Sequence, residues 1–145
     1  MADGVFNIAK GAAVEKVRDG AAALLILLLK TNEAEATLRD RDDVAAILAS
    51  GSTEADFTNY ARKTGLTGTI TVDDTNDRVD VDIPDQTWLV AGGATNNTLT
   101  KLIIAYQESA ADSGRIPLTH HDFAATTDSS DLTAQINASG FFRAS

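Results

Sequence analysis

The chain has 145 residues and a formal net charge of −9, from 21 acidic and 12 basic side chains. This length suits one compact unit around a single core, and the negative field would repel nucleic-acid backbones and anionic lipid headgroups. The sequence contains no cysteine, which excludes disulfide bonds, thiolate nucleophiles and sulfur-ligated metal sites. We therefore expect neither nucleic acid nor a membrane as a direct partner.

Residues 1–65 are predicted to form a cluster of short helices, because their apolar residues recur at helical spacing. Val5–Asp19 is predicted as the first helix, which either ends at Gly20 or continues through it into a helix over Ala21–Lys30. The apolar run Ala21–Leu29 would span about 13 Å as a helix, against ~30 Å for the hydrocarbon core of a membrane. We expect a buried helix there, in preference to a membrane-associated or irregular buried segment.

Two capping signals divide the rest of this region. Thr37–Asp40 matches a capping box and predicts a helix after it, where the apolar residues of Val44–Leu48 form one stripe. Thr53–Asp56 repeats the signal ahead of a second stripe over Phe57–Ala61. Three or four short helices are therefore expected.

After Gly65 the apolar period changes to two, which predicts six to eight short strands. The predicted strands are Thr69–Val72, Arg78–Ile83, Thr87–Val90, Leu99–Tyr106, Ile116–Thr119, Asp122–Thr126, Leu132–Ile136 and Gly140–Phe142. Leu99–Tyr106 is the most apolar and is expected at the centre of a sheet, covered on both faces. The fold class is thus predicted to be α+β, with a cluster of short helices over residues 1–65 and an antiparallel β-sandwich or small barrel over residues 66–145, in one compact unit.

One oxygen-rich cluster could in principle hold Ca²⁺. It consists of Asp73, Asp74, Asn76, Asp77, Asp80 and Asp82. The spacing lacks the glycine and the distal glutamate of an EF-hand loop, and Asp and Asn commonly form turns. We interpret the cluster as a turn with a solvated face and predict no metal site.

The histidines and serines do not form a convincing catalytic pattern. His120 and His121 are adjacent, so that on a strand they would point to opposite faces and could not chelate one ion together. Ser129 and Ser130 lack the glycine-flanked turn of a nucleophile. A triad of His120, Asp122 and a serine rests only on three common residue types, which can be found in almost any sequence. We predict no enzyme activity, no catalytic residue and no cofactor.

Three further patterns belong to loops. Gly92-Gly93 lacks the lysine and the helix of a phosphate-binding loop, which favours a tight turn or a flexible hairpin. Asn96-Asn97-Thr98 and Asn137-Ala138-Ser139 match the glycosylation pattern, which matters only in a secretory compartment. The loops Ala91–Asn97 and Ser109–Gly114 are the candidate ligand contacts if the chain binds a carbohydrate or a host receptor.

The order of several segments resembles that of uncharacterised virion proteins from the structural modules of tailed bacteriophages. The segments that carry the resemblance in the second half are Val79–Trp88, Gly92–Thr98, Lys101–Tyr106, Ile116–Phe123, Asp131–Asn137 and Gly140–Arg143. In the first half, Thr37–Asp40 and Phe57–Lys63 are similar to the same group. The resemblance covers nearly the whole chain, and no active-site motif anchors it.

The resemblance implies a non-enzymatic particle component, first of all a decoration or minor capsid protein that binds the outer head surface and stabilises the shell. Assembly would take place in the cytoplasm of the bacterial host. The implied partners are the major capsid protein or other virion proteins, together with further copies of the chain, for which a trimer is expected. The alternatives are a tail or connector component, such as a minor tail protein, and a carbohydrate- or host-receptor-binding domain.

Overall fold

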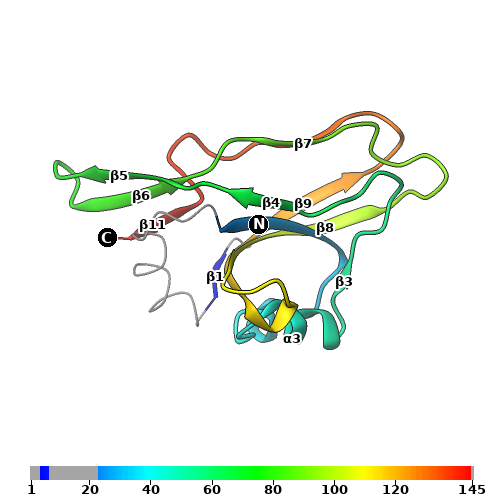
Figure 1. The fold of residues 1–145 in the computed structure, drawn as a ribbon, viewed down its shortest axis with the longest axis horizontal. Helices are drawn as coiled ribbons and strands as arrows, with labels where there is room; N and C mark the ends of the chain where they lie inside the picture. Colours follow the sequence, from blue (N-terminus) through cyan, green and yellow to red (C-terminus); the bar gives the residue numbers. More distant parts are fainter. Residues whose placement is uncertain (1–3, 7–22, 145) are drawn as a thin grey trace.

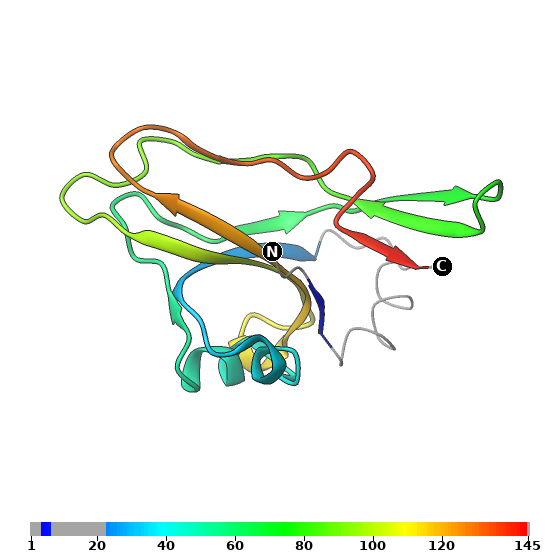
Figure 2. The same ribbon diagram turned by 180° about the vertical axis from the view of Figure 1, so that it is seen from behind.

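The computed structural model describes residues 4–6 and 23–144, which form a layered antiparallel β structure (Figures 1 and 2). A sheet of six strands lies in the middle, short helices cover one of its faces, and a ribbon of shorter strands runs over the other. A hairpin projects from one end of this body. The described part of the chain is mostly strand. The predicted α+β class with a helical cluster over residues 1–65 is therefore wrong, whereas a β-rich layered second half agrees with the prediction.

The central sheet has the strand order β1-β9-β8-β2-β3, and β4 pairs with the same edge of β2 as β3 does. Its strands are β1 (Gly4–Val5), β2 (Leu24–Thr31), β3 (Thr53–Glu54), β4 (Lys63–Leu66), β8 (Thr98–Gln107) and β9 (Arg115–Thr126). Leu102–Ala105 in β8 are at most 3% exposed, and β2 and β9 pair with its two edges. The prediction of a central strand covered on both faces is confirmed.

Two smaller sheets complete the strands. β5 (Thr69–Asp73), β6 (Arg78–Asp82) and β11 (Phe142–Ala144) form one, with β6 in the middle, and β7 (Gln86–Trp88) pairs with β10 (Leu132–Ala134) in the other. We call the β5–β6 hairpin, residues 69–82, the arm. The alternation in Arg78–Ile83 predicts that Val79, Val81 and Ile83 share the core face. Val81 and Ile83 are buried, whereas Val79, nearer the tip of the arm, is only partly buried. The two strands expected at Ile116–Thr119 and Asp122–Thr126 are one continuous strand, β9.

The apolar run Ala21–Leu29 contains a strand where a helix was predicted. Leu24–Leu29 in β2 are all 3% exposed or less, because β8 pairs with one edge of the strand, β3 and β4 pair with the other, and both faces are covered. A continuous apolar run shows no period, so it fits a buried helix as well as a buried strand, and leucine itself favours helix. Burial between two layers overrides that preference, as it does in strands covered on both sides.

The described helices are α2 (Glu35–Leu38), α3 (Val44–Ala49) and the short 3-10 turn η1 (Asp112–Gly114). The helix over Val44–Leu48 is confirmed, but its cap is Asp43, whose Oδ1 accepts a hydrogen bond from the Ala46 amide at 2.7 Å. Thr37–Asp40 does not open a helix, because α2 ends within it at Leu38.

The last predicted helix of this region is also wrong. Thr53 and Glu54 form β3, and Phe57–Ala61 is a loop in which the rings of Phe57 and Tyr60 meet edge to face with centroids 5.1 Å apart. Their helical spacing reflects packing within a turn. Of the predicted helix Val5–Asp19, Val5 lies in β1 and residues 7–19 lie outside the described residues.

Candidate interaction surfaces

The acidic cluster lies on the arm, where basic or amide side chains bind two of its carboxylates, those of Asp73 and Asp80. Asp73 accepts a hydrogen bond from Asn76 Nδ2 at 2.7 Å and lies 3.1 Å from Arg78 Nε, and the Asn76 hydrogen bond is the main cause that lowers the pKa of Asp73. Asp80 is buried between Arg78 and Arg143, whose Nε atoms lie 3.1 and 2.6 Å from its oxygens. Within residues 4–6 and 23–144, no group of three or more acidic or histidine side chains is placed to hold a metal ion.

The other acidic members of the cluster belong to the hairpin turn and its edges. Asp74 and Asp77 are exposed in the turn, where Asp77 has a φ of 49°. Asp82 accepts a hydrogen bond from the Ile83 amide at 2.9 Å. Asp73, Asp74 and Asp77 agree with the interpretation of the cluster as a turn with a solvated face, whereas Asp80 is buried.

The two histidines lie on opposite faces of the central sheet. His120 is fully buried on the face covered by α2, and its ring meets that of Phe6 edge to face at 5.3 Å. His121 lies on the other face, with Nε2 at 3.0 Å from Thr119 Oγ1. β9 runs extended from His120 to Thr126 and carries the chain about 20 Å away before the loop of Ser129 and Ser130 begins. Neither Ser129 nor Ser130 is therefore brought to His120.

A cavity of about 440 Å³ opens on the face of the central sheet opposite the helices. Leu102, Phe123, Ile136 and Phe141 give it an apolar lining, and His121 lies at its wall. A volume of this size can accept a small ligand or a side chain of a partner.

The Ala91–Asn97 loop is a tightly hydrogen-bonded turn. Gly92 and Gly93 have φ angles of 101° and 125°, and a Cβ atom on Gly92 would lie 2.1 Å from Oδ1 of Asn96. The same oxygen accepts a hydrogen bond from the Gly93 amide at 2.9 Å. Asn97 is buried, and its Oδ1 accepts from the amides of Asp56 and Phe57. Of the two interpretations left open for Gly92-Gly93, the structure shows the tight turn.

The only tryptophan of the sequence does not offer a stacking platform for a sugar. Trp88 is 2% exposed, and its indole Nε1 donates to the carbonyl of Ala61 at 2.7 Å. The ammonium of Lys63 lies over the ring, 5.1 Å from its centroid. In the second sequon, Asn137 is exposed and its Oδ1 accepts from the Ser139 amide.

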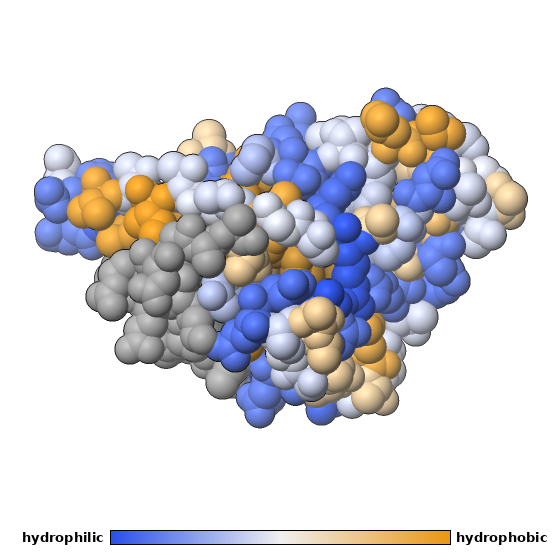
Figure 3. All heavy atoms as spheres, viewed as in Figure 1, coloured by the Kyte–Doolittle hydropathy of each residue, from blue (hydrophilic) through white to orange (hydrophobic). Residues whose placement is uncertain are grey.

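Large exposed apolar side chains gather in two places that lie far apart. Figure 3 shows apolar atoms on the arm and in a second patch at the other end of the molecule, over the end of β7. The arm carries Ile70 and Val72, which are 38% and 64% exposed, and the second patch carries Leu89 and Val90, which are 66% and 52% exposed. Exposed apolar patches on a folded protein mark contact sites for other molecules.

The second patch stands on a strained backbone. We call residues 89–90 the Leu89–Val90 knob. Val90 has a φ of 48°, in a region that β-branched residues avoid. Asn59 and Ser129 also have positive φ angles, of 70° and 77°, and both are hydrogen bonded to the chain at the knob.

Hydrogen bonds from two other loops fix the knob in place. The Val90 amide donates to Asp131 Oδ1 at 2.8 Å, and its carbonyl accepts from Asn59 Nδ2 at 2.9 Å. The next amide, of Ala91, donates to the Ser130 carbonyl at 2.9 Å. Strain of this kind persists only where the surrounding structure holds it, and it is typical of functional sites. These hydrogen bonds therefore hold the backbone of the knob in one conformation, so that little backbone freedom is left to lose on binding.

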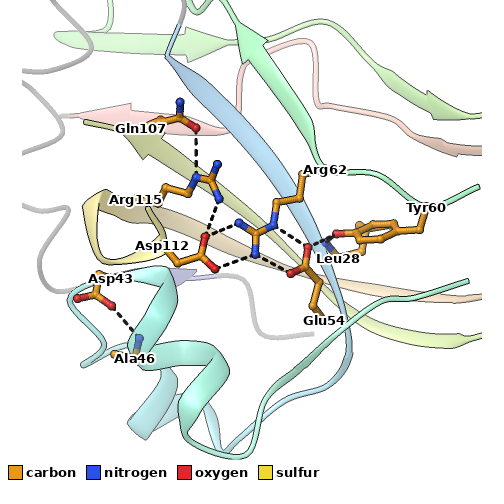
Figure 4. Close-up of polar contacts among 9 residues, drawn as sticks. All are labelled: Leu28, Asp43, Ala46, Glu54, Tyr60, Arg62, Gln107, Asp112 and Arg115. Carbon is orange, nitrogen blue, oxygen red and sulfur yellow. Dashed lines mark hydrogen bonds and ion pairs between the residues drawn. The ribbon is translucent and has the colours of Figure 1, made fainter. Parts of the chain in front are cut away.

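An ion network connects β3, the residue before β4, η1 and the start of β9 (Figure 4). Arg62 binds both carboxylate oxygens of Glu54 and also Asp112, and Arg115 binds Asp112 from the other side. The hydrogen bond to Glu54 raises the pKa of Arg62, and the hydrogen bond from Arg62 lowers that of Asp112. Tyr60 donates to Glu54 at 2.7 Å.

Tyr60 also accepts a hydrogen bond from the Leu28 amide at 3.1 Å, which connects the network to β2. Burial, followed by the charge of Glu54, holds the pKa of Tyr60 well above its ordinary value. The phenol therefore stays protonated and can serve Leu28 as acceptor and Glu54 as donor at once.

Sequence patterns did not single out the knob or the network. Leu89 and Val90 lie at the end of the predicted strand Thr87–Val90, where an apolar pair is expected to be buried. The adjacent Gly92-Gly93 was the one local sign that the strand ends early. The partners of Arg62 are 8 and 50 positions away in the sequence, and no local pattern connects them.

No family model, curated protein or solved structure matches the chain. Within the described residues, no helix has the length and apolar character needed to cross a membrane.

Proposed function

We propose that this protein is a non-enzymatic structural component of a tailed-bacteriophage virion, bound to the outer surface of the head as a decoration or minor capsid protein. The sequence resemblance to virion proteins supports the class of protein. The observation that carries the proposal from the structure is the Leu89–Val90 knob, an exposed apolar pair held on a strained and hydrogen-bonded backbone.

The charge and the separation of the two apolar patches support the same function. A net charge of −9 suits the outside of a shell better than its DNA-filled interior. The knob and the arm lie at opposite ends of the molecule, so that one can contact the shell while the other contacts a neighbouring subunit. The major capsid protein is the partner we propose for the knob.

Co-sedimentation of the purified chain with preassembled shells tests this function. We expect the chain to bind shells and to raise the temperature at which they open. The double variant Leu89→Ser/Val90→Asn is expected to weaken binding by about tenfold or more, because a few apolar anchors dominate most interfaces. The control variant Ala110→Ser/Ala111→Ser, in the exposed loop before η1, is expected to bind normally.

Two results would contradict the proposal. Failure of the native chain to sediment with shells would remove the head location, and co-purification with tails would move the chain to the tail or connector alternative. Equal binding by the Leu89→Ser/Val90→Asn and control variants would show that the knob is not the contact.

A further inference from the structure

One edge of β5 has no partner strand within the described residues. β6 pairs with the other edge over five residue pairs, from Thr69 opposite Asp82 to Asp73 opposite Arg78. On the free edge, every second residue directs its N–H and C=O groups away from the sheet. Such an edge is a template for another strand.

The sequence of this edge favours pairing with another strand. Thr69–Val72 is uncharged, contains no proline and consists entirely of β-branched residues, which favour strands. All four side chains are exposed. Proteins usually protect an edge with charges, proline or short length. β3 has only two residues and includes Glu54, and β11 has three and includes Arg143.

We propose that β5 pairs antiparallel with β5 of a second copy of this chain, about a two-fold axis at Thr71. In this register Ile70 lies opposite Val72 of the other copy, and Thr71 faces its own equivalent. All five residues of β5 are paired, and the apolar faces of both arms lie on the same side of the joined sheet. The result is a dimer, in place of the trimer expected from the resemblance, and its two arms form one continuous six-stranded sheet with the order β11-β6-β5-β5-β6-β11.

The charges on the arm are compatible with this register. Asp73 is the one charged residue of β5, and it falls at the end of the paired segment, opposite Thr69 of the other copy. Its carboxylate is already held by Asn76 and Arg78, so that no two unpaired like charges meet. Facing Ile and Val side chains on neighbouring strands contribute favourably to pairing.

An engineered cysteine tests the register directly, because the native sequence contains none. Facing residues of an antiparallel pair have Cβ atoms about 4.5–5.5 Å apart, close enough for a disulfide after a small adjustment. Thr71→Cys is expected to form a covalent dimer under mild oxidation. Thr75→Cys, exposed in the turn of the same arm, is the control and should form far less. Equal crosslinking of the two variants would overturn the pairing.

Charge variants at the two-fold axis provide a second test. Thr71→Lys and Thr71→Glu each place like charges face to face, so that each alone should sediment as a monomer, whereas the native chain should sediment as a dimer. An equal mixture of the two should recover the dimer mass, because opposite charges then meet. Native-like circular dichroism spectra would show that both variants fold. A monomeric or trimeric native chain, or dimers of either variant alone, would overturn the proposal.

These tests use purified protein and do not depend on the virion proposal. A dimer that fails to bind shells would contradict the proposed function alone. A monomer that binds them would contradict the pairing alone.

Discussion

His120 is a buried base without a hydrogen-bond partner for either ring nitrogen among the described residues. Burial, and next the positive charge of Lys101, lower its pKa below 6.5. Lys101 is itself buried and is bound by Asp122 and by Glu35. Burial opposes its charge, but these two hydrogen bonds outweigh burial and raise the pKa of Lys101. The cation beside His120 is therefore permanent, and protonating His120 would place a second charge next to it.

The buried imidazole predicts a loss of stability at mildly acidic pH. Because the pKa is lower in the folded state, the unfolded chain takes up the proton first as the pH falls. The contribution of the neutral His120 ring to the free energy of unfolding is therefore complete above the pKa that His120 has in the unfolded chain. It is lost as the pH drops through 6.5 toward the lower pKa of the folded state. We expect urea unfolding to show a smaller free energy at about pH 5.5 than at about pH 7.5.

The variant His120→Leu is the control for this pH effect. Leucine has a similar volume and cannot be protonated, so the difference between the two pH values should be much reduced. An unchanged pH dependence in His120→Leu would assign the effect to another group. The pKa values of Asp56 and Asp112 are also lowered, but these groups change the free energy of unfolding in a separate pH range, below their ordinary pKa of 3.8.

At Val90 stability and function are expected to change in opposite directions. A β-branched residue at a φ of 48° costs about 1–3 kcal/mol, and asparagine tolerates this region better. Val90→Asn keeps the backbone hydrogen bonds to Asn59 and Asp131. We expect the free energy of unfolding to rise by about 1 kcal/mol while shell binding weakens. A variant less stable than the native chain would contradict the claim that the backbone at Val90 is strained.

At the level of elements, the network around Arg62 joins the ends of β3, β4, β9 and η1 to the centre of the sheet. The Arg62 side chain is 16% exposed, and its two carboxylate partners are 21% and 30% exposed. Removing a cation from a buried group of this kind leaves unpaired carboxylates.

Arg62→Ala is therefore expected to lower the free energy of unfolding by about 2–3 kcal/mol, less than for a fully buried pair because solvent screens the partners. Lys30→Ala is the control, because Lys30 forms a single ion pair with Asp56 at 2.7 Å in which the two side chains are 28% and 62% exposed. A much smaller loss is expected there in the same urea titration. Equal losses would show that the Arg62 network adds nothing beyond a surface pair.

The strands with a clear alternation or strong β-branching could be predicted from sequence, and the leucine-rich strand could not. β6 alternates apolar and acidic residues, and β8 combines Ile103 and Ile104 with flanking turns, so that local patterns and packing agree. Leu24–Leu29 has no period to read, and only the pairing of β2 with β8 and β4 makes it a strand.

The candidate site depends still more on distant residues. The partners that hold Val90 are Asn59 and Asp131, which lie 31 and 41 positions away. Apart from the neighbouring Gly92-Gly93, the turn that exposes the knob therefore has no local signature. The acidic turn of the arm, in contrast, was predictable because Asp73 and Asn76 interact within the same hairpin.

For the whole molecule, one layered body separates two apolar surfaces. β2 and β8 pair over six residue pairs, which joins the first and second halves of the chain in one sheet. The arm projects from one end of this sheet and the knob lies at the other. Such an arrangement suits a subunit that binds a larger surface at one end and a like subunit at the other.

The most direct measurement is a density map of the intact particle in which this chain can be placed. We predict density for the layered body on the outer head surface, with the Leu89–Val90 knob against the shell and the free edge of β5 beside another copy. A map that shows this body only on the tail, or on no part of the particle, would contradict the head-decoration function.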